Sequence, residues 1–247
     1  MNLQDPLKGD DETLDAFYHG RIRVLQKKKG YRFSVDAPLL ADFIQTQPED
    51  DILELGTGCG IIPLLLSLKP FRNLIALEIQ ASLVDLAQRN VRLNTLEDRI
   101  TVLNQDLRTF SPSRKFDVVF SNPPYYARDK GHLSQSPEKS VAKHELKGDI
   151  FAIMRKTTEC LKPTGRAFFI FPERRREDFM QAISEPGLQM QRQRSVFPRK
   201  GEAANLFLAE CAFSSEMSEE MLPLILFAAD GKYSSEARAI FAGRSHA

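Results

Sequence analysis

The tetrapeptide Asn122-Pro123-Pro124-Tyr125 carries side chains that can hold an amino group. It follows the apolar run 116–120, and the two prolines must end that strand because neither has an N–H to donate. Prolines also keep the preceding residue extended, so the turn is stiff. The amide oxygen of Asn122 and the carbonyl of Pro123 can each accept one hydrogen of an amino group, while Tyr125 stacks on its planar carrier. The turn is therefore predicted to receive adenine, cytosine, guanine or a glutamine amide, and to act by positioning rather than as a strong base.

A second motif joins a predicted buried strand, 51–55, to a predicted helix, 61–68. The connecting residues are Gly56-Thr57-Gly58-Cys59-Gly60, directly after Glu54 and Leu55. Glycines at such a junction let the main chain approach a ligand closely. The spacing differs from the Gly-x-Gly-x-x-Gly of nicotinamide-binding folds, and a tight turn without a ligand is the alternative. Glu78 ends the next apolar run, 18 positions after Gly60, where an acid commonly binds ribose hydroxyls.

These motifs resemble those of class I S-adenosylmethionine-dependent methyltransferases that act on amino groups. Within that superfamily the chain resembles the bacterial tRNA1(Val) adenine-N6-methyltransferase family, through flanking segments at 30–37, Tyr125-Tyr126, 142–145 and 233–237. The resemblance implies methyl transfer from S-adenosylmethionine to N6 of an adenosine in tRNA. It further implies the adenosine immediately 3′ of the anticodon in valine tRNA.

The resemblance also implies a role for each motif residue. The glycines pass under the methionine part of the cofactor, Glu54 accepts a hydrogen bond from its ammonium group, and Glu78 holds the ribose diol. Asp106 accepts from the adenine amino group, although a simple turn cap is an open alternative. The cofactor-binding set is thus Glu54, Gly56, Gly58, Gly60, Glu78, Asp106 and Asn122. Asn122, Pro123 and Tyr125 form the catalytic set, and for Tyr126 substrate contact competes with core packing.

Composition agrees with an ordinary globular enzyme. A chain of 247 residues with 42% hydrophobic and 27% charged residues can form one α/β domain without disulfides or metals. It has no apolar stretch of membrane-spanning length, and its start is polar and acid-rich. The three cysteines are scattered without the spacing of metal ligands, which indicates a reducing, cytoplasmic location. His144 and Glu145 are adjacent, but one such pair without further ligands does not indicate a metal site.

The net charge of +1 conceals two basic segments. The first contains Arg21, Arg23, Lys27, Lys28, Lys29 and Arg32, and the second contains Arg174, Arg175, Arg176, Arg192, Arg194, Arg199 and Lys200. A solvated surface is the ordinary explanation for such segments. Next to a site for a base, they favour a polyanionic substrate such as tRNA. We predict that Lys27, Lys28, Lys29 and Arg32 contact phosphates.

Alternation of helical and extended patterns predicts a class I methyltransferase fold, which is a Rossmann-like α/β single domain. Its sheet is expected to have seven mostly parallel strands, with an antiparallel edge pair from 188–196 and 204–213. Residues 1–35 are expected to form an N-terminal extension in which strands 22–26 and 31–34 make a basic hairpin, and residues 36–247 to form the methyltransferase domain. The polar segment 127–139 is predicted to be a loop beside the site.

Three other functions are open from the sequence. A protein-glutamine N5-methyltransferase acting on a translation factor would use the same turn, because an amide presents the same two hydrogens. Its relatives usually carry a helical domain before the glycine motif, whereas here about 50 residues with a basic segment precede it. An rRNA guanine-N2-methyltransferase is a further possibility, and a catalytically silent RNA-binding module is the last. Intact glycines and Glu78 argue against the silent module, and the oligomeric state is left open.

Overall fold

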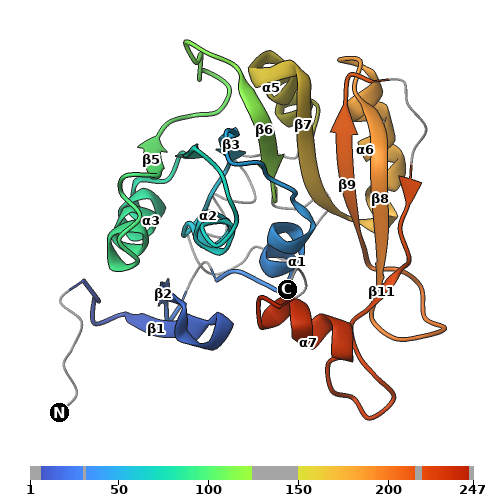
Figure 1. Cartoon of the computed structure of the whole chain (residues 1–247), viewed down its shortest axis with the longest axis horizontal. Coiled ribbons are helices and arrows are strands. Elements are labelled where there is room, and N and C mark those ends of the chain that lie inside the picture. The colour runs from blue at the N-terminus through green and yellow to red at the C-terminus, as the bar shows by residue number, and fades with distance from the viewer. Residues whose placement is uncertain (1–6, 30–31, 124–149, 215–218, 245–247) are drawn as a thin grey trace.

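The computed structural model describes residues 7–29, 32–123, 150–214 and 219–244 of the chain. A mixed sheet in the order β10-β8-β9-β7-β6-β3-β4-β5, with β11 beside β8, forms its centre (Figure 1). Its strands are β3 (Asp51–Leu55), β4 (Asn73–Glu78), β5 (Ile100–Asn104), β6 (Phe116–Ser121), β7 (Leu161–Pro172), β8 (Gln189–Phe197), β9 (Leu206–Ala212), β10 (Glu219–Glu220) and β11 (Leu224–Ile225).

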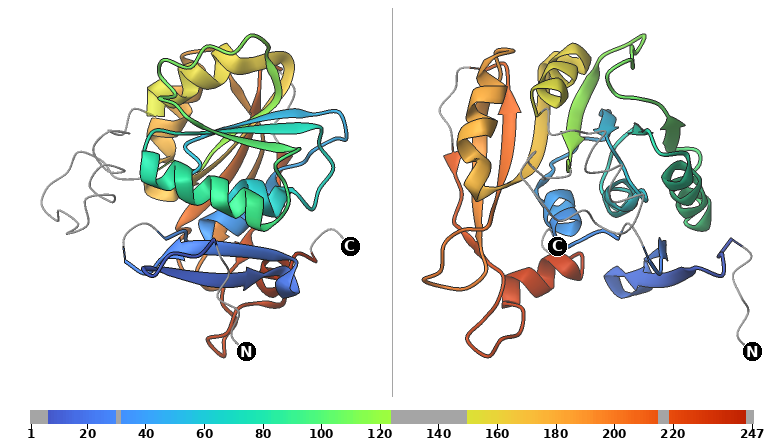
Figure 2. Two further views of the ribbon diagram at one scale, coloured as in Figure 1. Left: turned by 90° about the vertical axis from the view of Figure 1, so that its left-hand side faces the viewer. Right: turned by 180° about the vertical axis from the view of Figure 1, so that it is seen from behind.

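Helices cover both faces of this sheet, as the two views of Figure 2 show. They are α1 (Asp36–Phe43), α2 (Ile61–Leu66), α3 (Ala81–Leu93), α5 (Ile150–Cys160), α6 (Arg176–Ser184) and α7 (Ser235–Phe241), with short 3-10 turns η1 (Tyr18–Gly20) and η2 (Glu173–Arg175). Successive side chains of a strand point to opposite faces. Ile52 therefore joins the core of α1, α2, α3 and α7, while its neighbour Leu53 joins the core of α5 and α6.

The predicted fold class is confirmed. Strands β5, β4, β3, β6 and β7 are parallel, whereas β9 runs antiparallel to both β7 and β8. The predicted count of seven strands was too low, because β10 and β11 add to the edge beside β8. Each of these has only two residues, too few for the alternation by which a strand is recognised.

The predicted N-terminal hairpin exists, but its strands were wrongly paired. Strand β2 (Ile22–Lys27) pairs antiparallel with the preceding β1 (Glu12–Phe17), whereas residues 32–34 form no strand. The turn at η1 has left-handed backbone at Tyr18, His19 and Gly20, so it reverses the chain sharply. The acid-rich start of the chain supplies carboxylates to the hairpin, where Asp11 and Glu12 lie 3.0 and 3.4 Å from the ammonium group of Lys27 on β2. Figure 1 shows the hairpin beside α3. Its residues Ile22 and Leu25 belong to the core formed with α1, α2, α3 and α7.

Within the described part of the chain, no helix combines the length and apolarity needed to cross a bilayer. Cys59, Cys160 and Cys211 are all buried free thiols, and none of them is paired in a disulfide. Burial raises the pKa of Cys59 to about 12, so the thiol in the glycine loop stays protonated at neutral pH. The described residues contain no group of three or more side chains that could hold a metal ion.

Candidate functional site

The carboxyl ends of β3, β4 and β6 meet at one edge of the sheet. Glu54 of β3 lies beside Ala76 of β4 and Phe120 of β6 in the strand register, and all three strands are parallel. The chain passes from β3 to β4 on one side, and β6 lies on the other side of β3. Open α/β sheets bind ligands at such a switch point, outside the carboxyl ends of the strands. The glycine loop, Glu78 and Asn122 therefore follow three neighbouring strand ends.

The glycine loop is tightly folded against its surroundings. Gly56, Gly58 and Gly60 have φ values of +82°, +59° and +82°, a region that side chains with a Cβ rarely occupy. The amides of Gly56 and Thr57 both donate to the carbonyl of Leu77, at 3.0 and 2.9 Å. A Cβ on Gly60 would lie only 3.2 Å from the Cβ of Ala87 on α3. The main chain is therefore held in the form in which it can approach a ligand.

Glu78 braces this loop from the end of β4. Its side chain is buried, with 6% of its surface exposed. Its Oε2 accepts from the amide of Gly58 at 2.8 Å, and its Oε1 accepts from the amide of Gln80 at 3.0 Å. Burial raises the pKa of Glu78, and these backbone hydrogen bonds offset only part of that shift. Each carboxylate oxygen keeps a further lone pair for a donor from a ligand.

Glu54 is a buried carboxyl group without a full set of partners. It is 1% exposed, and neither its Oε2 nor the hydroxyl of Thr57 has a hydrogen-bond partner among the described residues. Burial, together with the nearby charge of Glu78, raises the pKa of Glu54 to about 8. A buried polar atom left unpaired is costly, so native proteins rarely keep one without a use. These two atoms fit a donor or a cation supplied by a ligand.

Asp106 is engaged locally in the turn after β5. Its Oδ1 accepts from the amide of Arg108 at 2.9 Å, and the guanidinium of Arg108 lies within 2.5 to 3.0 Å of both carboxylate oxygens. This pairing lowers the pKa of Asp106. The amide of Thr109 donates to the Asp106 carbonyl, as expected of a turn cap. The capping interpretation therefore has direct support, and recognition of an adenine amino group stays a prediction.

The proline turn begins where β6 ends. Asn122 is half-buried and Pro123 is buried. The hydroxyl of the preceding Ser121 donates to the carbonyl of Leu55 at 2.7 Å, which ties the end of β6 to the start of the glycine loop. The turn and the loop are thus held side by side. Tyr125, Tyr126, the segment 127–139 and His144 lie outside the described residues.

The basic segment near the N-terminus is largely compensated within the hairpin. The ammonium group of Lys27 lies 3.0 Å from Asp11 and 3.4 Å from Glu12, and that of Lys28 donates to the carbonyl of Asp10 at 2.7 Å. Arg32 pairs with Asp15 at 3.1 Å. Lys29 is exposed and has no ion pair with a described residue. Lys27 and Arg32 are thus ion-paired and Lys28 is hydrogen-bonded to a carbonyl, so Lys29 is the one of these four cations that has neither kind of partner among the described residues.

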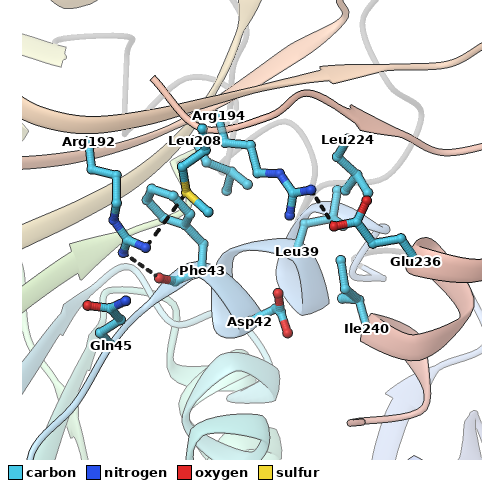
Figure 3. Close-up of a pocket in the computed structure, with 11 residues that line it drawn as sticks. Leu39, Asp42, Phe43, Gln45, Arg192, Arg194, Leu208, Leu224, Glu236 and Ile240 are labelled. Carbon is cyan, nitrogen blue, oxygen red and sulfur yellow. Dashed lines mark hydrogen bonds and ion pairs between the residues drawn. The ribbon is translucent and has the colours of Figure 1, made fainter. Parts of the chain in front are cut away.

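Several arginines of the second basic segment also point inward. Arg192 and Arg194 line a cavity of about 220 Å³ between α1, β8 and α7 (Figure 3). The guanidinium of Arg192 lies 4.3 Å above the ring of Phe43 and donates to Glu210 at 2.8 Å, while that of Arg194 pairs with Glu236. These contacts make both arginines part of the fold rather than of a basic surface. The cavity shares no lining residue with the glycine loop, Glu78 or Asn122.

One buried residue beside the glycine loop was missed by sequence reasoning. Asn90 lies within the apolar stripe of α3 and is 0% exposed. Its side-chain amide donates to the carbonyl of Cys59 at 2.9 Å. The signal in the sequence is an asparagine among the apolar residues that face the core, with a second, Asn94, one helical turn later. Such a residue requires partners, which the loop and the hairpin supply.

Comparison with known proteins gives the family. The family model described as the methyltransferase small domain matches residues 31–178, which is more than half of the chain. The chain belongs to this family. The matched part of this methyltransferase contains the glycine loop, Glu78 and Asn122.

Curated relatives match this methyltransferase over most of their length. A tRNA1(Val) (adenine(37)-N6)-methyltransferase of Vibrio campbellii is 26% identical over 91% of this chain and 93% of its own. The protein of the same name from Bacteroides thetaiotaomicron is 29% identical over 83% of this chain and 88% of its own.

Solved structures confirm the fold of the methyltransferase. A predicted O-methyltransferase from Agrobacterium tumefaciens matches with a TM-score of 0.66 at 19% identity, covering 85% of this chain and 97% of that one. The M. jannaschii tRNA m1G37 methyltransferase matches with a TM-score of 0.61 at 13% identity, covering 85% of this chain and 59% of that one. At these identities the likeness concerns the fold alone.

Proposed function

We propose that this methyltransferase transfers a methyl group from S-adenosylmethionine to N6 of an adenosine in tRNA. The observation that carries the proposal is the contact between Ser121 and Leu55, which fixes the amino-receiving turn against the glycine loop. The names of relatives that match 83 to 91% of the chain support an adenosine in tRNA, and position 37 of valine tRNA in particular. A tRNA substrate also agrees with the predicted cytoplasmic location.

The loop residues fit S-adenosylmethionine. The unpartnered oxygens of Glu54 and Thr57 and the positive φ angles of the glycines are what a bound ammonium group and a closely approaching ligand require. Glu54 would accept from the ammonium group, and Glu78 would accept from the ribose hydroxyls with its remaining lone pairs. When bound, the cofactor supplies an electrophilic methyl group on a sulfonium centre.

At the turn, Asn122 and Pro123 would hold the target amine by its two hydrogens. An aryl amine is a poor nucleophile because its lone pair is delocalised into the ring. Two acceptors placed outside the ring plane favour a tetrahedral nitrogen whose lone pair points toward the glycine loop. Tyr125, outside the described residues, would stack on the base, a contact worth about 1–3 kcal/mol in single-strand recognition. Because a paired base is unreachable, the target must lie in a loop or be flipped.

Transfer of labelled methyl groups tests this function. The chain is incubated with labelled S-adenosylmethionine and, in separate reactions, with total tRNA, rRNA and protein from a strain that lacks its gene. Nucleoside mass spectrometry should find N6-methyladenosine in tRNA, and a valine tRNA transcript should accept about one methyl group. Label in protein alone would support a glutamine methyltransferase, and label in guanosine of rRNA would support an N2-methyltransferase. Either result would contradict the proposal.

Cofactor affinity is expected to rise with pH up to about 8. Glu54 is neutral at pH 7 because burial raises its pKa to about 8. An ammonium group beside it favours the carboxylate, so binding releases a proton from Glu54. By linkage, the Kd for S-adenosylhomocysteine should fall as the pH rises from about 6 to 8 and then level off. Glu54→Gln cannot ionise and should lack this contribution. Calorimetry of both proteins across pH decides the matter, and identical pH profiles would contradict the role of Glu54.

We expect RNA phosphates to bind at a different surface from the N-terminal hairpin predicted from the sequence. Strands β7 and β8 end at the same edge as β6, because both run in the direction of β6. Arg174 follows β7 and Lys200 follows β8, and both are exposed without an ion pair to a described residue. A bond from the amide of Glu173 to the carbonyl of Asn205, at 2.9 Å, holds the two segments together. These free charges lie on the side of β6 away from the hairpin.

Replacing the cations of each surface in a separate variant should show which surface binds tRNA. Arg174→Ala with Lys200→Ala is expected to weaken tRNA binding and to flatten the plot of log affinity against log salt by about 0.7–0.9 per lost contact. Changing Lys27, Lys28 and Lys29 together to Ala should remove at most one such contact, because two of them are engaged by the hairpin. Filter binding at several salt concentrations provides the slopes. A larger loss of tRNA affinity in the lysine variant than in the Arg174 and Lys200 variant would identify the hairpin as the docking surface instead.

A further inference from the structure

Asn90 in α3 and Asn94, the residue that caps the C-terminal end of this helix, lie along the outer edge of the hairpin. The side-chain oxygen of Asn94 accepts from the amide of Arg23 at 2.9 Å, and its nitrogen donates to the carbonyl of Arg23 at 2.7 Å. Asn90 does the same to Leu25, at 2.6 and 3.0 Å. Each primary amide thus satisfies both main-chain groups of one residue of β2. Figure 2 shows α3 and the hairpin side by side in the left-hand view.

The spacing of the two elements makes this match possible. Residues four apart rise about 6 Å along a helix. Residues two apart rise about 6.6 Å along a strand. Asn90 and Asn94 therefore meet Leu25 and Arg23, the alternate residues of β2 whose N–H and C=O groups point away from β1. The two side chains take the place of a third strand.

Asn90 and Asn94 differ in the partner of the second side-chain hydrogen. The nitrogen of Asn94 donates it to the carbonyl of Asn90 at 2.8 Å, whereas the nitrogen of Asn90 donates it to the carbonyl of Cys59 in the glycine loop at 2.9 Å. The side chain is completely buried, so its three hydrogen bonds have no water to replace them. One helical turn earlier, Ala87 packs against Gly60. A single amide therefore joins the hairpin to the loop that Glu78 braces from the other side.

We propose that Asn90 is a positioning residue that couples docking of the N-terminal hairpin to cofactor binding. The inference rests on the proposed function, since it takes the glycine loop to be the cofactor loop. If the hairpin leaves α3, Asn90 loses two of its three partners, and the support of the Cys59 carbonyl weakens with them. Thermodynamic reciprocity then requires the cofactor to stabilise the docked hairpin by the same factor by which the hairpin strengthens cofactor binding.

Asn94 provides the matched control. Asn90→Ala and Asn94→Ala each remove two hydrogen bonds to β2, but only the first removes the bond to Cys59. In calorimetry, Asn90→Ala is expected to weaken binding of S-adenosylhomocysteine by about tenfold, the usual consequence of leaving one buried group unpaired. Asn94→Ala should weaken it by less than about threefold. Equal losses in the two variants would overturn the proposal.

Hydrogen exchange of the wild-type protein tests the coupling without any substitution, so the test stands even if Asn90→Ala does not fold. Saturating S-adenosylhomocysteine should slow exchange at the amides of Arg23 and Leu25, while amides of the β8–β9 ladder serve as the reference. Hairpin amides that do not respond would overturn the inference. Failure of the wild-type protein to bind S-adenosylhomocysteine would instead contradict the proposed function, so the two failures are distinguishable.

Discussion

Asn122→Ala is expected to abolish methyl transfer in practice, lowering the turnover rate by about 100- to 1,000-fold, the effect of removing one preorganised polar group that stabilises a transition state. Asn122 is the residue after β6, and its side-chain oxygen is one of the two acceptors that we assign to the target amine. The affinity for S-adenosylhomocysteine should change much less, because we propose that Glu54 and Glu78, and not Asn122, hold the parts of the cofactor remote from the methyl group. Single-turnover assays with saturating tRNA, together with calorimetry, measure the two quantities separately.

Two further variants identify the reason for this loss. Asn122→Asp keeps an accepting oxygen and should retain more activity than the alanine variant. Ser121→Ala removes the hydroxyl that ties β6 to Leu55 but leaves the amide in place, so it reports on a purely structural effect of the turn. Turnover near the wild-type rate in Asn122→Ala, at saturating tRNA, would refute the proposed role of this side chain.

Glu78→Ala is expected to weaken binding of S-adenosylhomocysteine by about 1–3 kcal/mol, or roughly 5- to 150-fold. Two effects contribute. The ribose hydroxyls lose the acceptor that we propose for them, and the amide of Gly58 loses the carboxylate that it contacts at 2.8 Å. Glu78→Gln keeps one accepting oxygen and should lose less. Calorimetry gives the dissociation constants of all three proteins.

A cofactor product without the 2′-hydroxyl separates these two effects. The wild-type protein should bind 2′-deoxy-S-adenosylhomocysteine more weakly than the parent compound, whereas Glu78→Ala should bind both with the same affinity. A similar preference in both proteins would mean that another residue holds the ribose. Glu78 would then act only as the brace of the glycine loop.

Much of the fold and part of the site could be predicted because apolar runs and glycines determine the structure of the segment in which they lie. The strand–loop–helix unit from Asp51 to Leu66 follows from a buried run, three glycines and a second buried run. Glu78 and Asn122 were placed at strand ends for the same reason, and the structure has them there. Their roles toward cofactor and substrate remain predictions.

The parts that could not be predicted depend on partners distant in sequence. A run of lysines looks like an exposed surface until Asp11 and Glu12 are known to lie on the neighbouring strand, at 3.0 and 3.4 Å from Lys27. Arg192 and Arg194 were assigned to a basic surface because their pairing with Glu210 and Glu236 is tertiary. Asn90 gave only a weak signal, since its partners lie 65 and 31 residues away.

The asparagine pair at the C-terminal end of α3, Asn90 and its capping neighbour Asn94, also bears on how the chain is synthesised. A two-stranded sheet with an open edge is a template for pairing with other chains, and proteins usually protect such edges. Here the protection comes from residues 65 to 71 positions further along the chain. The hairpin leaves the ribosome well before α3, so its outer edge stays open to other nascent chains until Asn94 has emerged. Self-association of incomplete chains is therefore a hazard built into this connectivity, and it ends when α3 folds against β2.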